Sequence, residues 1–258
     1  MVLLVGKCRV GSTAIANVFE HCNIPTYYQP IKTALRFLMI GESPTVAPIP
    51  TDARTICIKE TFGPFSPCES LYDPLSILLK SGVNPKSIRV VILERDPQLT
   101  LASWMKHWSN RLKPDLLLLI FAFSSFQRLT IEAVAKANAV DAHLIRHDTN
   151  LDRSRIQKLF SSLGLGEHFT DSALIDWRRV AGNMGSNDRL ILPTEPAQFY
   201  TNSLHEETNR FQVNTTNGTD TCGVHRNTLM ALRLFELFDS NINMLSLDKR
   251  IPDASAVG

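Results

Sequence analysis

The first thirteen residues place two glycines, two cations and two hydroxyl side chains directly after an apolar run. Gly6 and Gly11 have the spacing of the phosphate-binding pattern G-x-x-x-x-G-K-[ST], in which backbone N–H groups and a helix N-terminus surround phosphate oxygens. Ser12 stands where that pattern carries its lysine, and the positive charge lies inside the loop instead, as Lys7 and Arg9. The stretch therefore predicts an anion site for a ligand other than the γ-phosphate of a nucleoside triphosphate.

The loop Arg9-Val10-Gly11-Ser12-Thr13 resembles the 5′-phosphosulfate loop of sulfotransferases that use 3′-phosphoadenosine 5′-phosphosulfate (PAPS), which usually reads [KR]-x-G-[ST]-[ST] after an apolar strand. This resemblance implies cofactor contacts from Lys7, Cys8, Arg9, Val10, Gly11, Ser12 and Thr13. It also implies a catalytic role for Arg9, whose permanent charge would stabilise the bridging oxygen of the leaving group. Lys7 either touches the phosphosulfate or is a solvated loop lysine, and the sequence leaves both open.

A second match follows the apolar run Val90 to Leu93. Arg95 ends this expected strand, and Ser103 follows eight residues later on an expected helix, which resembles the 3′-phosphate site of the same family. An arginine fork makes charge-assisted bonds to a phosphate dianion, and a hydroxyl two helical turns on adds a donor. The two matches occur in the order that the family has.

The alternation of apolar runs and helical patterns predicts an α/β protein with a three-layer P-loop-like fold, in which helices flank a central, mostly parallel sheet. We expect a single domain over residues 1–258, with irregular cofactor- and substrate-covering loops at about 178–225. The expected strands are Val2 to Val5, Ile24 to Tyr28, Thr55 to Lys59, Val90 to Leu93 and Ala142 to Arg146. The expected helices are Ser12 to Cys22, Ile31 to Met39, Asp73 to Lys80, Leu99 to Trp108, Pro114 to Asn138, Arg153 to Leu163 and Arg226 to Phe238.

Two further roles rest on the resemblance. Cytosolic sulfotransferases carry Lys-Thr-His after a central strand, where this chain has Lys59-Glu60-Thr61, so Glu60 is the expected general base, and His107 is the reserve. Alternatively, Glu60 only pairs with Lys59 or Arg54 at the surface. Many PAPS enzymes also close a Gly-containing loop over the adenosine, and Gly182 and Asn183 are the candidates here.

Composition limits the remaining possibilities. A formal net charge of +2 over 258 residues argues against a nucleic-acid binder. Five scattered cysteines without a C-x-x-C pair indicate neither a disulfide framework nor a zinc site, and they favour a reducing compartment. No signal peptide precedes the first strand, and the apolar run Leu116 to Phe123 is too short to span a bilayer. We therefore expect a cytoplasmic protein without membrane contact.

The resemblance implies in-line transfer of a sulfonate from PAPS to the hydroxyl, or less readily the amine, of a small-molecule acceptor. The product would be adenosine 3′,5′-bisphosphate, and no metal is expected. Two alternatives remain: a nucleotide-binding protein with a degenerate P-loop, and a P-loop small-molecule kinase. A Rossmann site is disfavoured because the pattern from Gly6 to Gly11 lacks a central glycine. The identity of the acceptor and a homodimer are both left open.

Overall fold

The computed structural model describes residues 1–44, 49, 55–147, 152–175, 190–191, 195–196 and 199. The chain divides into two compact units, Met1–Thr216 and Asn217–Gly258, and every described residue belongs to the first. The prediction of one domain over 1–258 and that of a helix from Arg226 to Phe238 therefore both extend outside the described residues and stay predictions.

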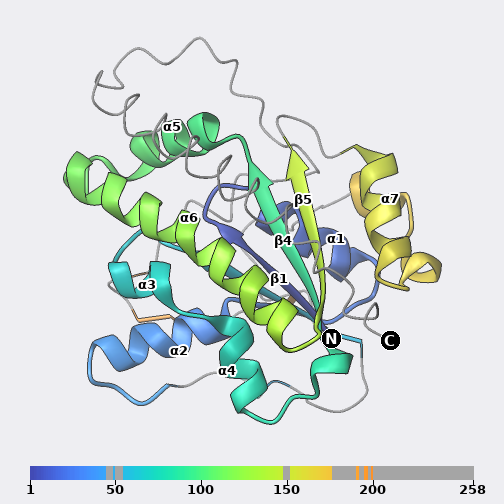
Figure 1. Ribbon diagram of the computed structural model, residues 1–258. Coiled ribbons are helices and arrows are strands. Elements are labelled where there is room, and N and C mark those ends of the chain that lie inside the picture. Colours follow the sequence, from blue (N-terminus) through green and yellow to red (C-terminus); the bar gives the residue numbers. More distant parts are fainter. Residues whose placement is uncertain are drawn as a thin grey trace, which may run out of the picture. The chain divides into compact units, whose positions relative to one another are not determined.

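Among the described residues, the chain alternates between strands and helices (Figure 1). The strands are β1 (Val2–Lys7), β2 (Thr26–Tyr28), β3 (Cys57–Phe62), β4 (Arg89–Arg95), β5 (Asp141–His147) and β6 (Leu190–Ile191). The α-helices are α1 (Ser12–His21), α2 (Pro30–Met39), α3 (Pro67–Leu71), α4 (Pro74–Lys80), α5 (Pro97–Trp108), α6 (Pro114–Ala137), α7 (Arg153–Ser162) and α8 (Ser172–Ile175).

The six strands form one sheet in the order β5-β4-β1-β3-β2-β6, and every neighbouring pair is parallel. Strand β1 lies between β3 and β4, with Val5 opposite Glu60 on one side and Ile92 on the other. The carboxyl ends of parallel strands lie at one edge of a sheet. The residues that follow β1, β3 and β4 therefore come together there.

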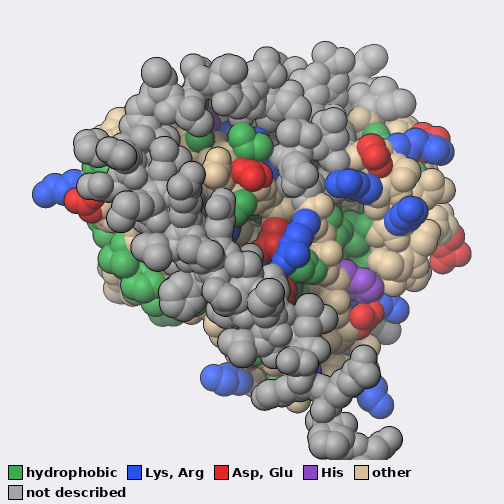
Figure 2. Space-filling view, turned by 45° about the horizontal axis from the view of Figure 1, so that its top comes forward, with side chains coloured by type: hydrophobic (Ala, Val, Ile, Leu, Met, Phe, Trp, Pro, Cys, Tyr) green, Lys and Arg blue, Asp and Glu red, His purple; other side chains and the backbone are tan. Residues whose placement is uncertain are grey.

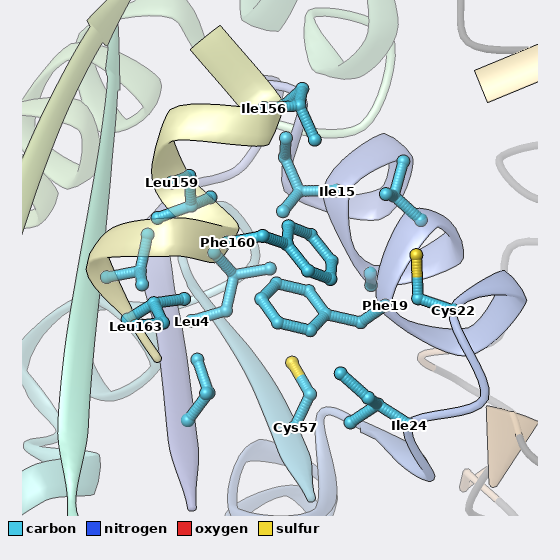
Figure 3. Packing of buried hydrophobic residues seen from close by; sticks show 14 of the residues in the cluster. Leu4, Ile15, Phe19, Cys22, Ile24, Cys57, Ile156, Leu159, Phe160 and Leu163 are labelled. Atoms are coloured by element: carbon cyan, nitrogen blue, oxygen red, sulfur yellow. The ribbon is translucent and has the colours of Figure 1, made fainter. Parts of the chain in front are cut away.

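Helices cover both faces of the sheet. On one face, Leu4 of β1 packs with Ile15 and Phe19 of α1 and with Phe160 of α7, and the two phenyl rings stack with their centroids 4.8 Å apart (Figure 3). The other face is covered by α2, α4 and α6; its core residues include Leu3, Val5, Ile31, Ile58, Leu75 and Ile131. The predicted three-layer arrangement is confirmed.

Strand β3 begins and ends later than the sequence predicts. We expected Thr55 to Lys59, whereas the strand runs from Cys57 to Phe62, because its ladder with β1 continues to the pair Lys7 and Phe62. Glu60 therefore lies within the strand and not in a loop after it. A residue inside a strand points to one face of the sheet, and Glu60 shares the face of Ile58, next to α2.

Helix α6 is the one helix among the described residues that is long and apolar enough to cross a membrane by length and composition, and 44% of its apolar window is buried. The run Leu116 to Phe123, which we judged too short to span a bilayer, is only part of this helix. The buried side chains of α6 include Ile131 and Ala135, which belong to the core beneath the sheet.

Candidate functional site

The loop between β1 and α1 has the backbone of an anion cradle. Arg9 and Gly11 both adopt positive φ angles, 72° and 81°. Gly11 is the residue before α1 and provides no side-chain cap. Alternation of left-handed and right-handed residues turns successive N–H groups toward one point, and the first turn of a helix leaves its N–H groups without intrahelical partners. The two positive φ angles suit the predicted anion cradle, and its ligand stays a prediction.

Gly6 has a packing reason to be glycine. A Cβ atom at this position would lie 2.7 Å from the carbonyl oxygen of Leu93 and 2.8 Å from Cγ2 of Val10. The missing side chain lets β4 approach β1 closely and lets Val10 fold back over the strand. Val10 is completely buried in the core on the α1 face, so only its backbone is available to a ligand.

The two predicted cofactor motifs meet in space. The guanidinium Nε of Arg9 donates to Ser103 Oγ at 3.0 Å, across 94 residues of sequence. Nη1 of Arg95 donates to the carbonyl oxygen of Arg9 at 3.4 Å. Burial and the neighbouring charge of Arg9 lower the pKa of Arg95. Two cations held this close together in a partly buried place favour an anionic ligand.

Lys59 is a further candidate site residue, for which the sequence predicted no role. It lies opposite Leu4 and Tyr28 in the sheet, on the face that α1 covers, and only 2% of it is exposed. Its ammonium lies 3.8 Å from the ring centroid of Tyr28, whose hydroxyl is 3.3 Å from Thr13 Oγ1. No salt bridge joins Lys59 to a carboxylate of the described residues. Side chains along a strand point to alternate faces of the sheet, so the sequence of β3 could have shown that Lys59 lies on the α1 face.

Lys7 points to the other face of the sheet. Its ammonium donates to Ser125 Oγ of α6 at 3.1 Å and lies 4.8 Å from the ring centroid of Phe121. This contact ties the end of β1 to α6. The lysine is therefore not a simple solvated loop residue, and its contact with the phosphosulfate stays a prediction.

Glu60 is completely buried, and both of its carboxylate oxygens accept hydrogen bonds. Oε1 accepts from the N–H of Ile31 at 2.7 Å, and Oε2 accepts from the N–H of Lys32 at 3.2 Å and from the Tyr72 hydroxyl at 2.8 Å. Burial raises the pKa of Glu60 to about 7. The carboxylate thus binds the first N–H groups of α2, a favourable place for a negative charge.

Next to Glu60 lies a buried ion network. Lys32 and Arg36 of α2, which are 1% and 3% exposed, bind the carboxylate of Glu69 at 3.2 Å and 2.8 Å. The Lys32 ammonium also lies 3.9 Å from Cys8 Sγ, and this thiol is 3.0 Å from the carbonyl oxygen of Gly63. Helix α2 therefore contacts the loop between β1 and α1 through Lys32.

Figure 2 turns the end of the molecule at the top of Figure 1 toward the viewer. Where no grey atoms cover this end, basic and acidic side chains lie beside each other.

His107 lies on α5, one turn after Ser103, with its ring centroid 6.0 Å from that of Trp108. The predicted lid residues Gly182 and Asn183 lie outside the described residues. Within the described residues, no group of three or more His, Cys, Asp or Glu side chains is placed to hold a metal ion.

No protein-family model and no curated protein matches the chain. Solved structures of low identity do match. Shikimate kinase from Bacteroides thetaiotaomicron is 16% identical, with a TM-score of 0.37, over 64% of this chain and 98% of the kinase. The YorR protein of Bacillus subtilis, in complex with phosphorylated GDP, is 13% identical, with a TM-score of 0.39, over 66% of this chain and 99% of YorR. A gluconokinase from Sinorhizobium meliloti 1021 is 12% identical, with a TM-score of 0.37, over 63% of this chain and 94% of the gluconokinase.

These similarities are too low to transfer a reaction or a substrate. The parallel sheet order, the helices on both of its faces and the glycine-framed loop between β1 and α1 are observations on this chain itself. They define a three-layer α/β fold of the P-loop type.

Proposed function

We propose that this protein transfers a sulfonate from PAPS to a small-molecule acceptor. The observation that carries the proposal is the group of three cations, Arg9, Arg95 and Lys59, which come from three separate segments to the region around the N-terminus of α1. Such a group suits a ligand with several anionic groups bound at two neighbouring places.

The phosphosulfate end would occupy the loop. Its oxygens would accept from the N–H groups that follow Arg9, and Lys59 would supply the charge that the missing P-loop lysine provides in nucleoside triphosphatases. During transfer, negative charge grows on the oxygen that links phosphate to sulfonate, and the Arg9 guanidinium would stabilise it. The sulfonate moves in line: its bond to this oxygen breaks as the bond to the acceptor oxygen forms, and the acceptor proton passes to a base.

The 3′-phosphate would bind Arg95 and Ser103. Ser103 Oγ accepts a hydrogen bond from Arg9, so its own hydroxyl proton remains to be donated to a phosphate oxygen. One hydroxyl can thus serve the guanidinium and the phosphate at the same time. The arrangement would let the protein distinguish adenosine 3′,5′-bisphosphate from AMP.

The base stays a prediction with two candidates. A carboxyl whose pKa is about 7 is well suited to accept a proton at neutral pH. The three hydrogen bonds to Glu60 and its complete burial, however, fit a group that holds α2 in place. His107 is the other candidate because it lies on the same helix as Ser103.

A P-loop small-molecule kinase is the second candidate function. The spacing of Gly6 and Gly11 favours it, as does Thr13, which stands where such kinases carry the hydroxyl that binds Mg²⁺. The pattern is incomplete, however, because Ser12 stands where such kinases carry the P-loop lysine. We therefore place the kinase second.

Transfer assays with the full chain separate the two candidates. Radiolabelled PAPS is offered with phenols, alcohols, sugars and amines as acceptors, and labelled Mg–ATP is offered with the same panel. Sulfonation of an acceptor, with no phosphorylation, supports the proposal. Phosphorylation from ATP establishes the kinase, and binding of adenosine 3′,5′-bisphosphate without any transfer identifies a nucleotide-binding protein that lacks turnover.

A further inference from the structure

Trp104 follows Ser103 on α5 and has no exposed surface. Its indole Nε1 donates a hydrogen bond of 2.7 Å to the carbonyl oxygen of Cys8, in the loop of residues 8–11 between β1 and α1, which we call the phosphate loop. A side chain of the β4–α5 segment thus reaches a backbone group of the loop 96 residues earlier in the chain.

The next carbonyl of the loop, that of Arg9, is bound by Arg95 from the same segment. A carbonyl oxygen repels an anion, and each peptide group points its N–H opposite to its C=O. Two successive carbonyls bound by donors outside the cradle therefore leave the following N–H groups turned into it. The positive φ of Arg9 and of Gly11 completes this arrangement.

The indole ring is itself fixed on several sides. A Cβ atom at Gly63 would lie 2.4 Å from Cη2 of Trp104, so the ring occupies the space that only a glycine leaves. Phe121 of α6 and Trp108 of α5 pack edge-on against it, with centroids 5.2 Å and 5.6 Å away. A ring held in this way gives the Cys8 carbonyl a donor in a constant position.

We propose that Trp104 is a positioning residue that holds the phosphate loop in its anion-binding conformation through the Cys8 carbonyl. The proposal rests on the proposed function only for the identity of the anion, because any ligand that accepts hydrogen bonds from the loop would depend on the same contact.

The test compares Trp104→Phe with Trp108→Phe. Both changes remove an indole from the same buried cluster on the same helix, but only Trp104 binds the loop among the contacts described. Backbone hydrogen exchange is measured for the peptide that covers residues 8–14, in each full-length variant without ligand. We expect exchange about tenfold faster or more in Trp104→Phe than in Trp108→Phe after correction for global stability, since a loop released from its anchor opens locally. Equal exchange in the two variants overturns the proposal.

A ligand measurement follows. Adenosine 3′,5′-bisphosphate and inorganic pyrophosphate are titrated into the same proteins. Trp104→Phe should weaken binding of the ligands that bind wild type by about 2- to 10-fold relative to Trp108→Phe, the usual net worth of one hydrogen bond. Unchanged affinity also overturns the proposal. If wild type binds neither probe, the proposed function fails, while the exchange measurement still decides the role of Trp104.

Should Trp104→Phe fail to fold, the double variant Trp108→Phe with Trp177→Phe leaves Trp104 as the single tryptophan. In the ¹⁵N-labelled protein, its indole N–H should exchange at least about a hundredfold more slowly than that of a free peptide, as expected for a buried hydrogen bond. An indole N–H that exchanges at the free-peptide rate contradicts the anchor.

Discussion

The Lys59 ammonium lies 3.8 Å from the ring centroid of Tyr28, in a position where only 2% of the lysine is exposed. An ammonium buried on an aromatic ring without a carboxylate partner among the described residues costs solvation free energy that the cation–π contact offsets only in part. An anionic ligand bound beside Lys59 would offset this cost.

Lys59→Met should separate binding from stability. We expect weaker binding of adenosine 3′,5′-bisphosphate by about 10- to 150-fold, the loss of one or more hydrogen bonds to a charged group. The free energy of unfolding should stay within about 1 kcal/mol of wild type or rise, because the methionine keeps the volume and removes the buried charge. Calorimetric titration and urea unfolding measure the two quantities.

Lys7→Met is the matched control for this variant. Its ammonium binds Ser125 on the other face of the sheet, so nucleotide affinity should change by less than about threefold, as for a side chain that makes no ligand contact. A larger loss of affinity in Lys7→Met than in Lys59→Met would reverse the assignment of the loop cation.

Arg9→Ala should affect turnover more than binding. The negative charge on the oxygen between phosphate and sulfonate, which Arg9 would stabilise, grows in the transition state. We therefore expect the sulfonate-transfer rate to fall about 10²- to 10³-fold, while product-nucleotide affinity falls much less. Single-turnover kinetics with PAPS provide the rate. A variant that turns over like wild type but binds weakly would make Arg9 a binding residue only.

Arg95→Gln should remove the preference for a 3′-phosphate. AMP has the same 5′-phosphate as adenosine 3′,5′-bisphosphate, so the ratio of the two affinities isolates the 3′-phosphate contact. This ratio should fall by about 10- to 150-fold in Arg95→Gln and stay constant in the control Ser125→Ala. A ratio that survives the loss of Arg95 would place the 3′-phosphate elsewhere.

Stability should fall with rising pH because of Glu60. Its pKa is about 7 in the folded protein, above the value near 4.3 expected in an unfolded chain, so the folded state favours the protonated form. The contribution to the free energy of unfolding is therefore fully present below pH 4 and is lost as the pH rises through 7, by up to about 4 kcal/mol. Urea unfolding between pH 4 and 8 should show this loss in wild type and not in Glu60→Gln. Parallel curves for the two proteins would show that Glu60 does not titrate in this range.

The same variant tests the base. If Glu60 takes the acceptor proton, Glu60→Gln should lower turnover by about 10²- to 10⁴-fold with nucleotide affinity intact. If Glu60→Gln remains active and His107→Ala is folded but inactive, the base is His107.

Local sequence patterns predicted the two segments that meet at the site. Gly6 and Gly11 identified the loop, and Arg95 and Ser103 identified the β4–α5 junction, because each pattern lies within a few residues and depends on one local geometry. The predicted parallel sheet followed from the same alternation of apolar runs and helices.

The roles of the β3 residues could not be predicted in this way. The end of β3 depends on its ladder with β1, and the face of each residue follows from that register. The hydrogen bonds of Glu60 come from Ile31, Lys32 and Tyr72, which only the tertiary fold brings to it. The contact of the Lys59 ammonium with the Tyr28 ring likewise depends on the pairing of β3 with β2.

The most direct test of the central claim is a calorimetric titration of the wild-type protein with adenosine 3′,5′-bisphosphate, AMP and Mg–ATP. The account predicts that adenosine 3′,5′-bisphosphate binds at least about tenfold more tightly than AMP, from the ionic hydrogen bonds to its 3′-phosphate, and more tightly than Mg–ATP. Equal affinities for the bisphosphate and AMP, together with tighter binding of Mg–ATP, would contradict the PAPS site and favour the kinase.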